Sequence, residues 1–204
     1  MHATLKGDSP ALIEPVPPGL VARITGRERS LFLPDIEKHR RDLEEACAAS
    51  RILVAGAAGS IGAATVKKLA AFRPRGLALV DTNENALADL VRLLRAGPFD
   101  LPKDFSTSAV ALGSPGFARF LAAAGPFQIV FNFAALKHVR SERDAFSLMR
   151  MIETNVFAVE DLIRAAAVPS LRVFSVSSDK AVSPRNLMGA TKRWMERTLA
   201  EASG

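Results

Sequence analysis

Short apolar runs alternate with longer segments of helical periodicity from residue 51 to the end of the chain. Apolar runs of strand length stand at residues 52–55, 77–80, 109–112, 129–133 and 172–176, and the third is the weakest. Segments with apolar residues at helical spacing predict helices at residues 61–72, 84–94, 117–124, 153–167 and 186–202. Because parallel strands need crossover connections, this alternation predicts an α/β fold, a doubly wound parallel sheet with helices on both faces.

The first fifty residues follow a different pattern. Four prolines within residues 8–19 predict an extended arm, because proline lacks an amide donor and fixes its own backbone angle. Pro34 predicts the start of a helix that runs to about residue 49, whose apolar positions share one side: Ile36, Leu43 and Cys47. The sequence therefore predicts two parts, an N-terminal arm and helix at residues 1–50 and an α/β domain at residues 51–204.

Three glycines at the spacing G-x-x-G-x-x-G lie between the first predicted strand and the first predicted helix: Gly56, Gly59 and Gly62. Glycine lets the backbone turn tightly and approach a pyrophosphate, which then meets free amides at the positive end of the helix. Ser60 and Ile61 complete this turn and are predicted to contact the cofactor. Glycines also mark ordinary turns, but the flanking strand and helix favour an NAD(P)-binding Rossmann domain at residues 51–204.

Asp81 closes the second predicted strand, about twenty residues after the glycine turn. An acid at this place accepts hydrogen bonds from the adenosine ribose and repels a 2′-phosphate, which favours NAD over NADP. The alternative is that Asp81 only caps the next helix, a role for which Thr82 and Asn83 are equally suited. Ala134 and Ala135 follow the fourth strand, where small residues let the cofactor approach closely.

A second group of side chains follows the fifth predicted strand and continues into the last helix: Ser177, Ser178, Asp179, Lys180, Met188 and Lys192. In an open parallel sheet, ligands bind beyond the carboxyl ends of the strands, so this group is expected to face the same crevice as the cofactor. Met188 and Lys192 are four residues apart and share one helical face. Taken alone, the segment also fits a loop with a local ion pair. The order of the elements places both groups beyond the carboxyl ends of the strands, which favours a functional site.

These motifs resemble the extended short-chain dehydrogenases that act as UDP-N-acetylglucosamine 4,6-dehydratases, the CapD-like polysaccharide biosynthesis proteins. The resemblance covers about residues 51–200 and is carried by GAAGSIG at 56–62, DTNEN at 81–85, FAALKHV at 133–139, TNV at 154–156 and SSDKAVSPRNLMGATKR at 177–193. The last segment is the most specific, because the usual short-chain dehydrogenase carries Tyr-x-x-x-Lys where this chain has Met188 and Lys192. Several dehydratases of this family also have methionine there.

The resemblance implies a three-stage reaction on one tightly held NAD. Hydride leaves C4 of the hexose, water departs from C5 and C6, and the hydride returns to C6. By that similarity Lys180 removes the C5 proton, Asp179 protonates the departing hydroxyl and Ser178 hydrogen-bonds the substrate O4. Lys192 binds the nicotinamide ribose and lowers neighbouring pKa values by its charge. Met188 has no proton to exchange, so it forms an apolar wall or marks a domain that has lost its chemistry, and the base for the C4 hydroxyl is left unassigned.

Lys137 and His138 follow the fourth strand and are expected to face the substrate, and the alternative for His138 is a purely structural role. A metal site is not expected, because His2 and His39 lie in the N-terminal part and give His138 no ligand spacing. Asn155 matches the helix-bending asparagine of the family, although an exposed asparagine would give the same pattern.

Two departures from the family pattern stand out. Family members usually carry an aspartate after the third strand that contacts the adenine, whereas this chain has Leu112, Gly113 and Ser114, so backbone groups are expected to recognise the adenine. The C-terminal substrate subdomain of extended short-chain dehydrogenases has no counterpart in the sequence, which implies the N-terminal portion of a longer enzyme. A missing sheet edge would leave apolar surface exposed.

Composition refines this picture. The 204 residues are 49% hydrophobic and carry a formal net charge of +6. The basic residues are scattered among acids and do not gather with aromatics, so no nucleic-acid partner is expected. No apolar run approaches the roughly 18 to 20 residues of a membrane span. The single cysteine and the lack of a signal stretch favour the cytoplasm, and a homo-oligomer formed through the helix near Glu153 and the last helix is expected.

Three hypotheses follow for the function. The first is a nucleotide-sugar 4,6-dehydratase, or part of one, that serves polysaccharide or glycan assembly. The second is a catalytically silent NAD-binding or scaffold module whose residues 1–50 contact another chain. The third, a nucleotide-sugar epimerase, shares the fold but has less need of Asp179 and Lys180. The intact set of polar side chains favours the first hypothesis, and the missing substrate region favours the second.

Overall fold

The computed structural model describes residues 19–28, 31–137, 142–165 and 171–203. The chain divides into two compact units, Met1–Arg41 and Asp42–Gly204, and each is described by itself. The sequence places this boundary at residue 50. Apart from Gly19, the predicted extended arm at residues 8–19 lies outside the described residues.

Two short helices make up the described part of the first unit, α1 (Leu20–Thr25) and α2 (Leu33–Lys38). Pro34 lies in the first turn of α2, where its missing amide hydrogen costs nothing. The next helix, α3 (Arg40–Ala49), runs into the second unit. The prediction of one continuous helix to residue 49 is wrong, because the backbone at His39 leaves helical angles and separates α2 from α3.

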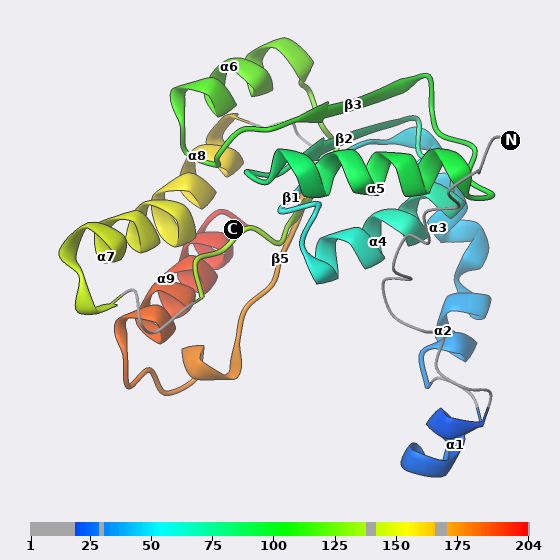
Figure 1. Ribbon diagram of the computed structural model, residues 1–204, viewed down its shortest axis with the longest axis horizontal. Helices are drawn as coiled ribbons and strands as arrows, with labels where there is room; N and C mark the ends of the chain where they lie inside the picture. The colour runs from blue at the N-terminus through cyan, green and yellow to red at the C-terminus, as the bar shows by residue number, and fades with distance from the viewer. Residues whose placement is uncertain (1–18, 29–30, 138–141, 166–170, 204) are drawn as a thin grey trace, which may run out of the picture. The chain divides into compact units, whose positions relative to one another are not determined.

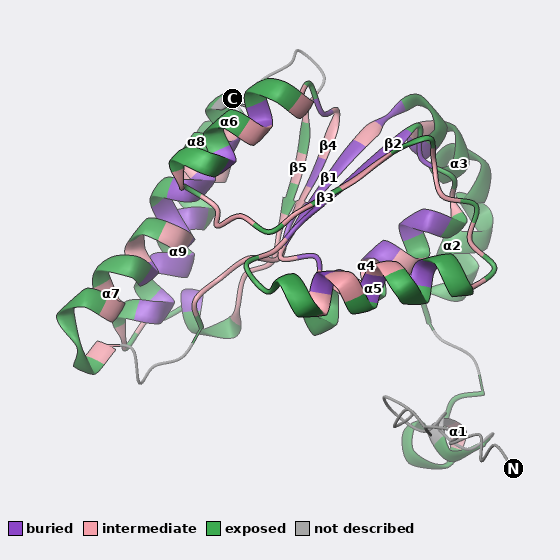
Figure 2. Cartoon of the chain, turned by 45° about the horizontal axis from the view of Figure 1, so that its top comes forward, coloured by how far each residue is buried: buried purple, intermediate pink, exposed green. Residues whose placement is uncertain are grey.

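The second unit is built on one sheet of five parallel strands, in the order β3-β2-β1-β4-β5. The strands are β1 (Arg51–Ala55), β2 (Gly76–Val80), β3 (Asp104–Ser108), β4 (Ile129–Asn132) and β5 (Arg172–Ser175). The chain runs outward from β1 to β3 (Figure 1), then returns to β4 and continues outward to β5 on the other side (Figure 2). The strand order therefore reverses between β1 and β4, where open α/β sheets bind ligands. The predicted doubly wound parallel α/β fold is confirmed.

Helices cover both faces of this sheet (Figure 2). The helices that follow α3 are α4 (Ser60–Ala71), α5 (Glu84–Ala96), α6 (Pro115–Ala124), α7 (Ala145–Ile152), α8 (Ala158–Ala165) and α9 (Leu187–Glu201), with a π-helical turn at Glu153–Phe157 and a 3-10 turn at Asp179–Ala181. Residues of α3, α4 and α5 pack on one face, and residues of α6 and α8 pack on the other. Within the described residues, no helix combines the length and the apolar character needed to cross a membrane.

Successive residues of the central strand β1 serve the two layers in turn. Ile52 and Val54 belong to the core cluster that contains Val66 of α4, whereas Leu53 belongs to the cluster that contains Phe117 of α6. All three β1 residues are fully buried. A central parallel strand is covered on both faces, so it reads as a continuous apolar run instead of an alternation.

The third strand was predicted at the wrong place. The apolar run at residues 109–112 predicts the strand, but β3 lies at Asp104–Ser108. This strand forms one edge of the sheet, and its residues are half-buried or exposed, so polar side chains are tolerated there and no apolar run marks it. The apolar residues after β3 instead form part of the wall of the cleft described below.

The helical region before β5 begins earlier than predicted. The sequence predicts a helix at residues 153–167, whereas α7, the π-helical turn and α8 run without a break from Ala145. Asp144 caps α7 by accepting a hydrogen bond from the backbone N–H of Ser147 at 2.8 Å. An aspartate at this place is the usual signal for a helix start.

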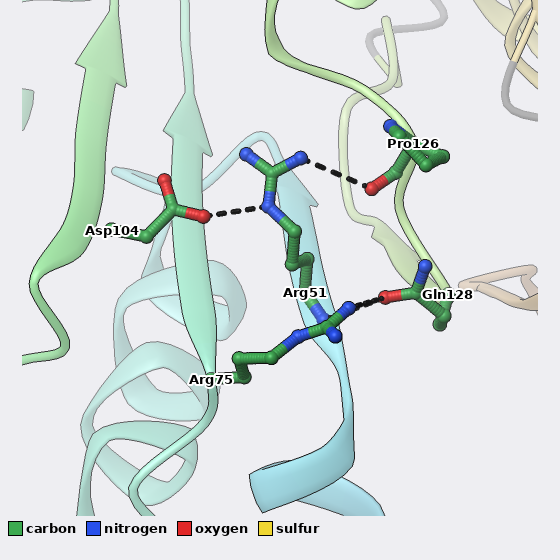
Figure 3. Close-up of polar contacts among 5 residues, drawn as sticks. All are labelled: Arg51, Arg75, Asp104, Pro126 and Gln128. Atoms are coloured by element: carbon green, nitrogen blue, oxygen red, sulfur yellow. Dashed lines mark hydrogen bonds and ion pairs between the residues drawn. The ribbon is translucent and has the colours of Figure 1, made fainter.

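A polar cluster ties together the amino ends of the strands (Figure 3). Arg51 Nε lies 2.6 Å from Asp104 Oδ2, and the same guanidinium donates to the carbonyl of Pro126 at 3.2 Å. Gln128 Oε1 accepts bonds of 2.9 Å from the backbone N–H of Arg51 and from the Arg75 guanidinium. The cluster joins β1 and β3 to the segment before β4. It lies at the amino ends of the strands, whereas parallel α/β sheets bind ligands beyond the carboxyl ends. We therefore assign the cluster a structural role.

Candidate functional site

A cleft of about 250 Å³ lies beyond the carboxyl ends of β1, β2 and β4. Its lining includes Gly56 and Gly59 of the glycine turn, Asp81 after β2, and Ala134 and Ala135 after β4. The structure thus brings five of the predicted cofactor residues to one cleft, although they lie on three different segments of the chain.

The glycine turn has its shape because side chains are excluded from it. Gly56 has a φ of 73°, and a Cβ there would lie 2.6 Å from the backbone N of Ala134. A Cβ on Gly62 would lie 2.1 Å from the carbonyl oxygen of Gly56. The first position needs glycine for its left-handed backbone and for the close approach of the segment after β4, and the second needs it for the contact between α4 and the turn.

The start of α4 offers hydrogen-bond donors without a side-chain partner. Gly59 is the N-cap residue, and no side chain caps this end of the helix. The N–H groups of the first turn, those of Ser60 and Ile61 among them, have no acceptor within the helix. A phosphate group fits such a helix end, because the donors and the helix dipole both favour negative charge.

Asp81 connects the end of β2 to the glycine turn. Its Oδ2 accepts a hydrogen bond from the Ala58 N–H at 2.9 Å, and its Oδ1 accepts one from the Asn83 N–H at 3.0 Å. The N-cap of α5 is Asn83, which accepts a bond from the Ala86 N–H. The alternative that Asp81 serves as the helix cap is therefore wrong. Asp81 holds the glycine turn and lines the cleft.

A second pocket, of about 320 Å³, adjoins the first, and Phe133, Ala135 and Lys137 line both. The second pocket is lined by predicted residues from four segments: the one after β5, the start of α9, the glycine turn and the one after β4. They are Ser177, Ser178, Lys180, Met188, Lys192, Ile61, Ala135 and Lys137. Asp179 is exposed and does not line this pocket. His138 lies outside the described residues.

Lys192 is buried, with 6% of its surface exposed. Its Nζ donates a hydrogen bond of 2.9 Å to the carbonyl of Val176, which fixes the amine beside the pocket. Burial lowers the pKa of Lys192, and the charge of Glu196 opposes this shift to a smaller extent. Met188, one turn earlier on α9, is buried as well and gives the same pocket an apolar wall.

Ser178 and Asp179 form a local pair. The Ser178 hydroxyl donates to Asp179 Oδ1 at 3.0 Å. This bond, followed by the charge of Lys180, holds the pKa of Asp179 below its ordinary value. Asp179 is therefore an ionised carboxylate at neutral pH while Ser178 remains bonded to it.

Asn155 links the segment after β4 to α9. It lies in the π-helical turn with 1% of its surface exposed. Its Oδ1 accepts from the Leu136 N–H, and its Nδ2 donates to the Leu136 carbonyl, both at 2.9 Å. Nδ2 also donates to Thr191 Oγ1 at 3.1 Å, and Thr191 donates to the Met188 carbonyl. The alternative of an exposed asparagine is wrong, and the residue couples the walls of the two pockets.

Two further polar residues position the site and were missed by the sequence analysis. Asn132 is buried, accepts a bond from the Ala134 N–H and donates to Ser175 Oγ, each at 3.1 Å. Glu142 accepts a bond of 2.8 Å from the Met188 N–H at the start of α9. A polar residue inside the apolar run of β4 could have indicated Asn132. No local pattern indicates Glu142, because its contact is 46 residues away in the sequence.

The arrangement fits a dinucleotide. The uncapped start of α4 suits a pyrophosphate, and Asp81 lies where a ribose hydroxyl would be bound. Among the described residues, Ser177 has a buried hydroxyl without a hydrogen-bond partner, and it lies at the second pocket. A buried polar atom without a partner is costly, and a polar ligand group would relieve that cost.

Comparison with known proteins gives the family. The sequence profile of the family described as "polysaccharide biosynthesis protein" matches residues 52–204. An uncharacterized membrane protein of Methanocaldococcus jannaschii is 34% identical over 156 residues, which cover 74% of this chain and 43% of that protein. The probable polysaccharide biosynthesis protein EpsC of Bacillus subtilis is 31% identical over 149 residues, which cover 72% of this chain and 24% of EpsC. The chain therefore spans less than half the length of these curated relatives.

Solved structures share the fold. Pen from Bacillus thuringiensis superposes with a TM-score of 0.65 at 25% identity, over 76% of this chain and 46% of that chain. WbmG of Bordetella bronchiseptica, solved with NAD and UDP, has a TM-score of 0.58 at 16% identity, over 74% of this chain and 50% of that one. FolM of Brucella canis, solved with NADP, has a TM-score of 0.63 at 18% identity, over 76% and 69%. The fold is thus that of NAD(P)-binding Rossmann proteins, and by sequence the chain belongs to the polysaccharide biosynthesis protein family.

Proposed function

We propose that this chain provides the dinucleotide-binding and catalytic part of a nucleotide-sugar 4,6-dehydratase that acts on a UDP-N-acetylglucosamine-like substrate. The observation that carries the proposal is the pocket that holds Ser178, Lys180 and Lys192 and shares a wall with the cleft of the glycine turn. A base and a hydroxyl donor serve elimination across C5 and C6, and a fixed cation beside a dinucleotide site serves to hold the acceptor of the C4 hydride, while the acceptor of the C4 hydroxyl proton stays unassigned.

The cofactor of this proposal is NAD, which when bound accepts the C4 hydride and later returns it to C6. Gly56, Gly59 and the N–H groups of Ser60 and Ile61 would hold its pyrophosphate, and Lys192 its nicotinamide ribose. The carboxylate of Asp81 would accept bonds from the adenosine ribose, and its negative charge would repel a 2′-phosphate. These roles favour NAD over NADP.

Ser178 would change its hydrogen-bond partner when the substrate binds. In the structure its hydroxyl donates to Asp179, and this bond is the main cause of the low pKa of that carboxyl. If Ser178 donates to the substrate O4 instead, the pKa of Asp179 rises, and exclusion of water by the sugar raises it further. Asp179 would then hold the proton that leaves with the C6 hydroxyl, so the acid would form only in the presence of substrate.

Lys180 would remove the C5 proton, which becomes acidic once C4 is a ketone. Lys137 lines both pockets and, with His138, would contact the substrate. Met188 has 3% of its surface exposed and forms an apolar wall where most short-chain dehydrogenases have a tyrosine. Oxidation at C4 lacks the usual tyrosine as proton acceptor in a dehydratase and in an epimerase alike, but an epimerase has less need of the acid and the base that Asp179 and Lys180 would provide.

The proposal extends to location and assembly. NAD and nucleotide sugars place the reaction in the cytoplasm. The surface of the π-helical turn and α9 would carry the contact of a homo-oligomer, because Phe157 and Trp194 expose 46% and 51% of their surfaces there and meet edge to face. No nucleic-acid partner is proposed.

The test is to incubate the protein, including any sequence that follows Gly204 in the native polypeptide, with NAD and UDP-N-acetylglucosamine. The expected product is a 4-keto-6-deoxy sugar nucleotide, lighter than the substrate by one water, and Asp179→Ala and Lys180→Ala should abolish it. Lys103→Ala, at an exposed lysine before β3, is the matched control. A product of unchanged mass and inverted C4 would identify an epimerase. Bound NAD without product would identify a silent module.

A further inference from the structure

We propose that Arg150, on the wall of the cleft that contains the glycine turn, binds the diphosphate of the dinucleotide. The inference rests on the proposed function only in its choice of cofactor. It assigns to α7 a direct part in ligand binding.

Arg150 lies where a ligand would reach it. It is exposed near the end of α7, four residues before Thr154, and both residues line the same cleft as Gly56 and Gly59. Residues four apart share one helical face, so the last turn of α7 and the turn after it face the cleft together. Among the described residues, the guanidinium of Arg150 has no ion pair and no hydrogen bond. Its five N–H donors are therefore open to a ligand.

The charge balance of the cleft calls for such a cation. Of the described residues in its lining, one is acidic, Asp81, and two are basic, Lys137 and Arg150. Both oxygens of Asp81 already accept backbone N–H bonds, so this carboxylate is fixed in place. The first turn of α4 carries no acidic or basic side chain. A helix end counts for roughly half a positive charge, whereas the diphosphate of a dinucleotide carries two negative charges. The remaining charge is best balanced by the basic side chains that line the same cleft.

Position separates the two cations. Lys137 lines both pockets and can serve the substrate, whereas Arg150 lines the first cleft and not the second. Because the first cleft contains the glycine turn, the diphosphate beside Arg150 is that of the cofactor and not that of a nucleotide sugar. Arginine also suits this ligand, since its planar fork donates two parallel bonds to phosphate oxygens.

The segment after β3 increases the importance of the contact between Arg150 and the diphosphate. Gly113 has a φ of 74°, and a Cβ there would lie 3.0 Å from Cβ of Ala158. The positive φ disfavours any side chain at this position, and its Cβ would press on Ala158 of α8. The chain therefore lacks an acidic contact to the adenine at this turn, and recognition of the adenosine half depends more strongly on its phosphates.

Calorimetric titration of the protein with NAD, ADP, adenosine and UDP tests the inference. Arg150→Ala should weaken NAD and ADP about three- to fivefold, as expected for a charge-assisted contact at an exposed site, and should leave adenosine and UDP unchanged. Arg150→Lys keeps the positive charge but loses the planar guanidinium group, so its affinity for NAD and ADP should lie between those of the wild type and Arg150→Ala. The affinity of the wild type for NAD should fall more steeply with added salt than that of Arg150→Ala. Arg119→Ala, at an exposed arginine of α6, is the matched control.

Three results would overturn the inference. They are wild-type affinity of Arg150→Ala for NAD and ADP, an equal loss for adenosine, and a loss for UDP instead of ADP. The proposed function is judged separately, by the sugar product. If the sugar product forms but Arg150→Ala binds NAD as tightly as the wild type, only the role of Arg150 is refuted. If NAD affinity depends on Arg150 but no product forms, the dehydratase is refuted and the role of Arg150 is supported.

Discussion

Two glycines of one turn should respond differently to the same added methyl group. At Gly62 a Cβ would meet three backbone atoms, the closest being the Gly56 carbonyl oxygen at 2.1 Å. At Gly59 the nearest atom is that same oxygen at 3.4 Å, an ordinary contact. Gly62→Ala should therefore damage the fold, whereas Gly59→Ala should leave the fold intact and place its methyl group beside the open donors of α4.

The magnitudes follow from these distances. A carbon–oxygen contact of 2.1 Å must lengthen by more than 1 Å, and all the atoms that must move are backbone. Such overpacking costs about 2–4 kcal/mol, of which better helix propensity returns about 1 kcal/mol, so Gly62→Ala should lower the free energy of unfolding by about 1–3 kcal/mol. For Gly59→Ala, the weaker N-cap and the reduced entropy of the unfolded chain nearly cancel, which leaves a change within about 0.5 kcal/mol.

Urea denaturation followed by circular dichroism measures the first effect, and calorimetric titration with NAD measures the second. We expect Gly59→Ala to unfold with the wild type and to bind NAD at least about tenfold more weakly, because the methyl group crowds the donors that would meet the pyrophosphate. Full NAD affinity in Gly59→Ala, or wild-type stability in Gly62→Ala, would refute this account of the turn.

Three further predictions concern the site. Asn155→Ala should lower the free energy of unfolding by about 2–4 kcal/mol in urea, because it removes the partner of both backbone groups of half-buried Leu136 and one bond to buried Thr191; a loss below about 1 kcal/mol would contradict the coupling described above. Ser178→Ala should raise the pKa of Asp179 toward its ordinary value in an NMR titration, since the main pKa-lowering bond is removed; an unchanged pKa would exclude that cause. Burial lowers the pKa of Lys192 in the folded protein. At pH values between the folded and the unfolded pKa of this lysine, the unfolded chain therefore binds more protons than the folded one. As pH rises through that range, the wild type should gain stability relative to Lys192→Met. Thermal denaturation across pH measures this difference, and a loss with rising pH would have the wrong sign.

Local patterns predicted most of the sheet and the first cleft. The strands β1, β2 and β4 are apolar on both faces, so a plain apolar run marks each of them. The glycine turn needs specific residues at fixed spacing, and this requirement is visible in the sequence. The edge strand β3 was misplaced because its exposure removes the demand for apolar side chains.

Contacts between distant segments were beyond the reach of the sequence. The hydrogen bond from Met188 to Glu142 and those from Asn155 to Leu136 and Thr191 join segments whose proximity only the fold creates. The ionisation of Asp179 could not be predicted either, because its pKa depends on the rotamer of the neighbouring serine. The sequence therefore predicts which polar residues belong to the second pocket, but it does not predict the contacts that determine their protonation.

Isotope tracing tests the central claim most directly. UDP-N-acetylglucosamine carrying deuterium at C4 is incubated with the protein and NAD, and the sugar product is analysed by mass and NMR. Transient oxidation followed by elimination predicts that the deuterium appears in the C6 methyl group of a 4-keto product, because the hydride removed from C4 is returned to C6. Deuterium retained at C4 of an epimerised sugar, or a product without deuterium at C6, would contradict the proposed dehydration.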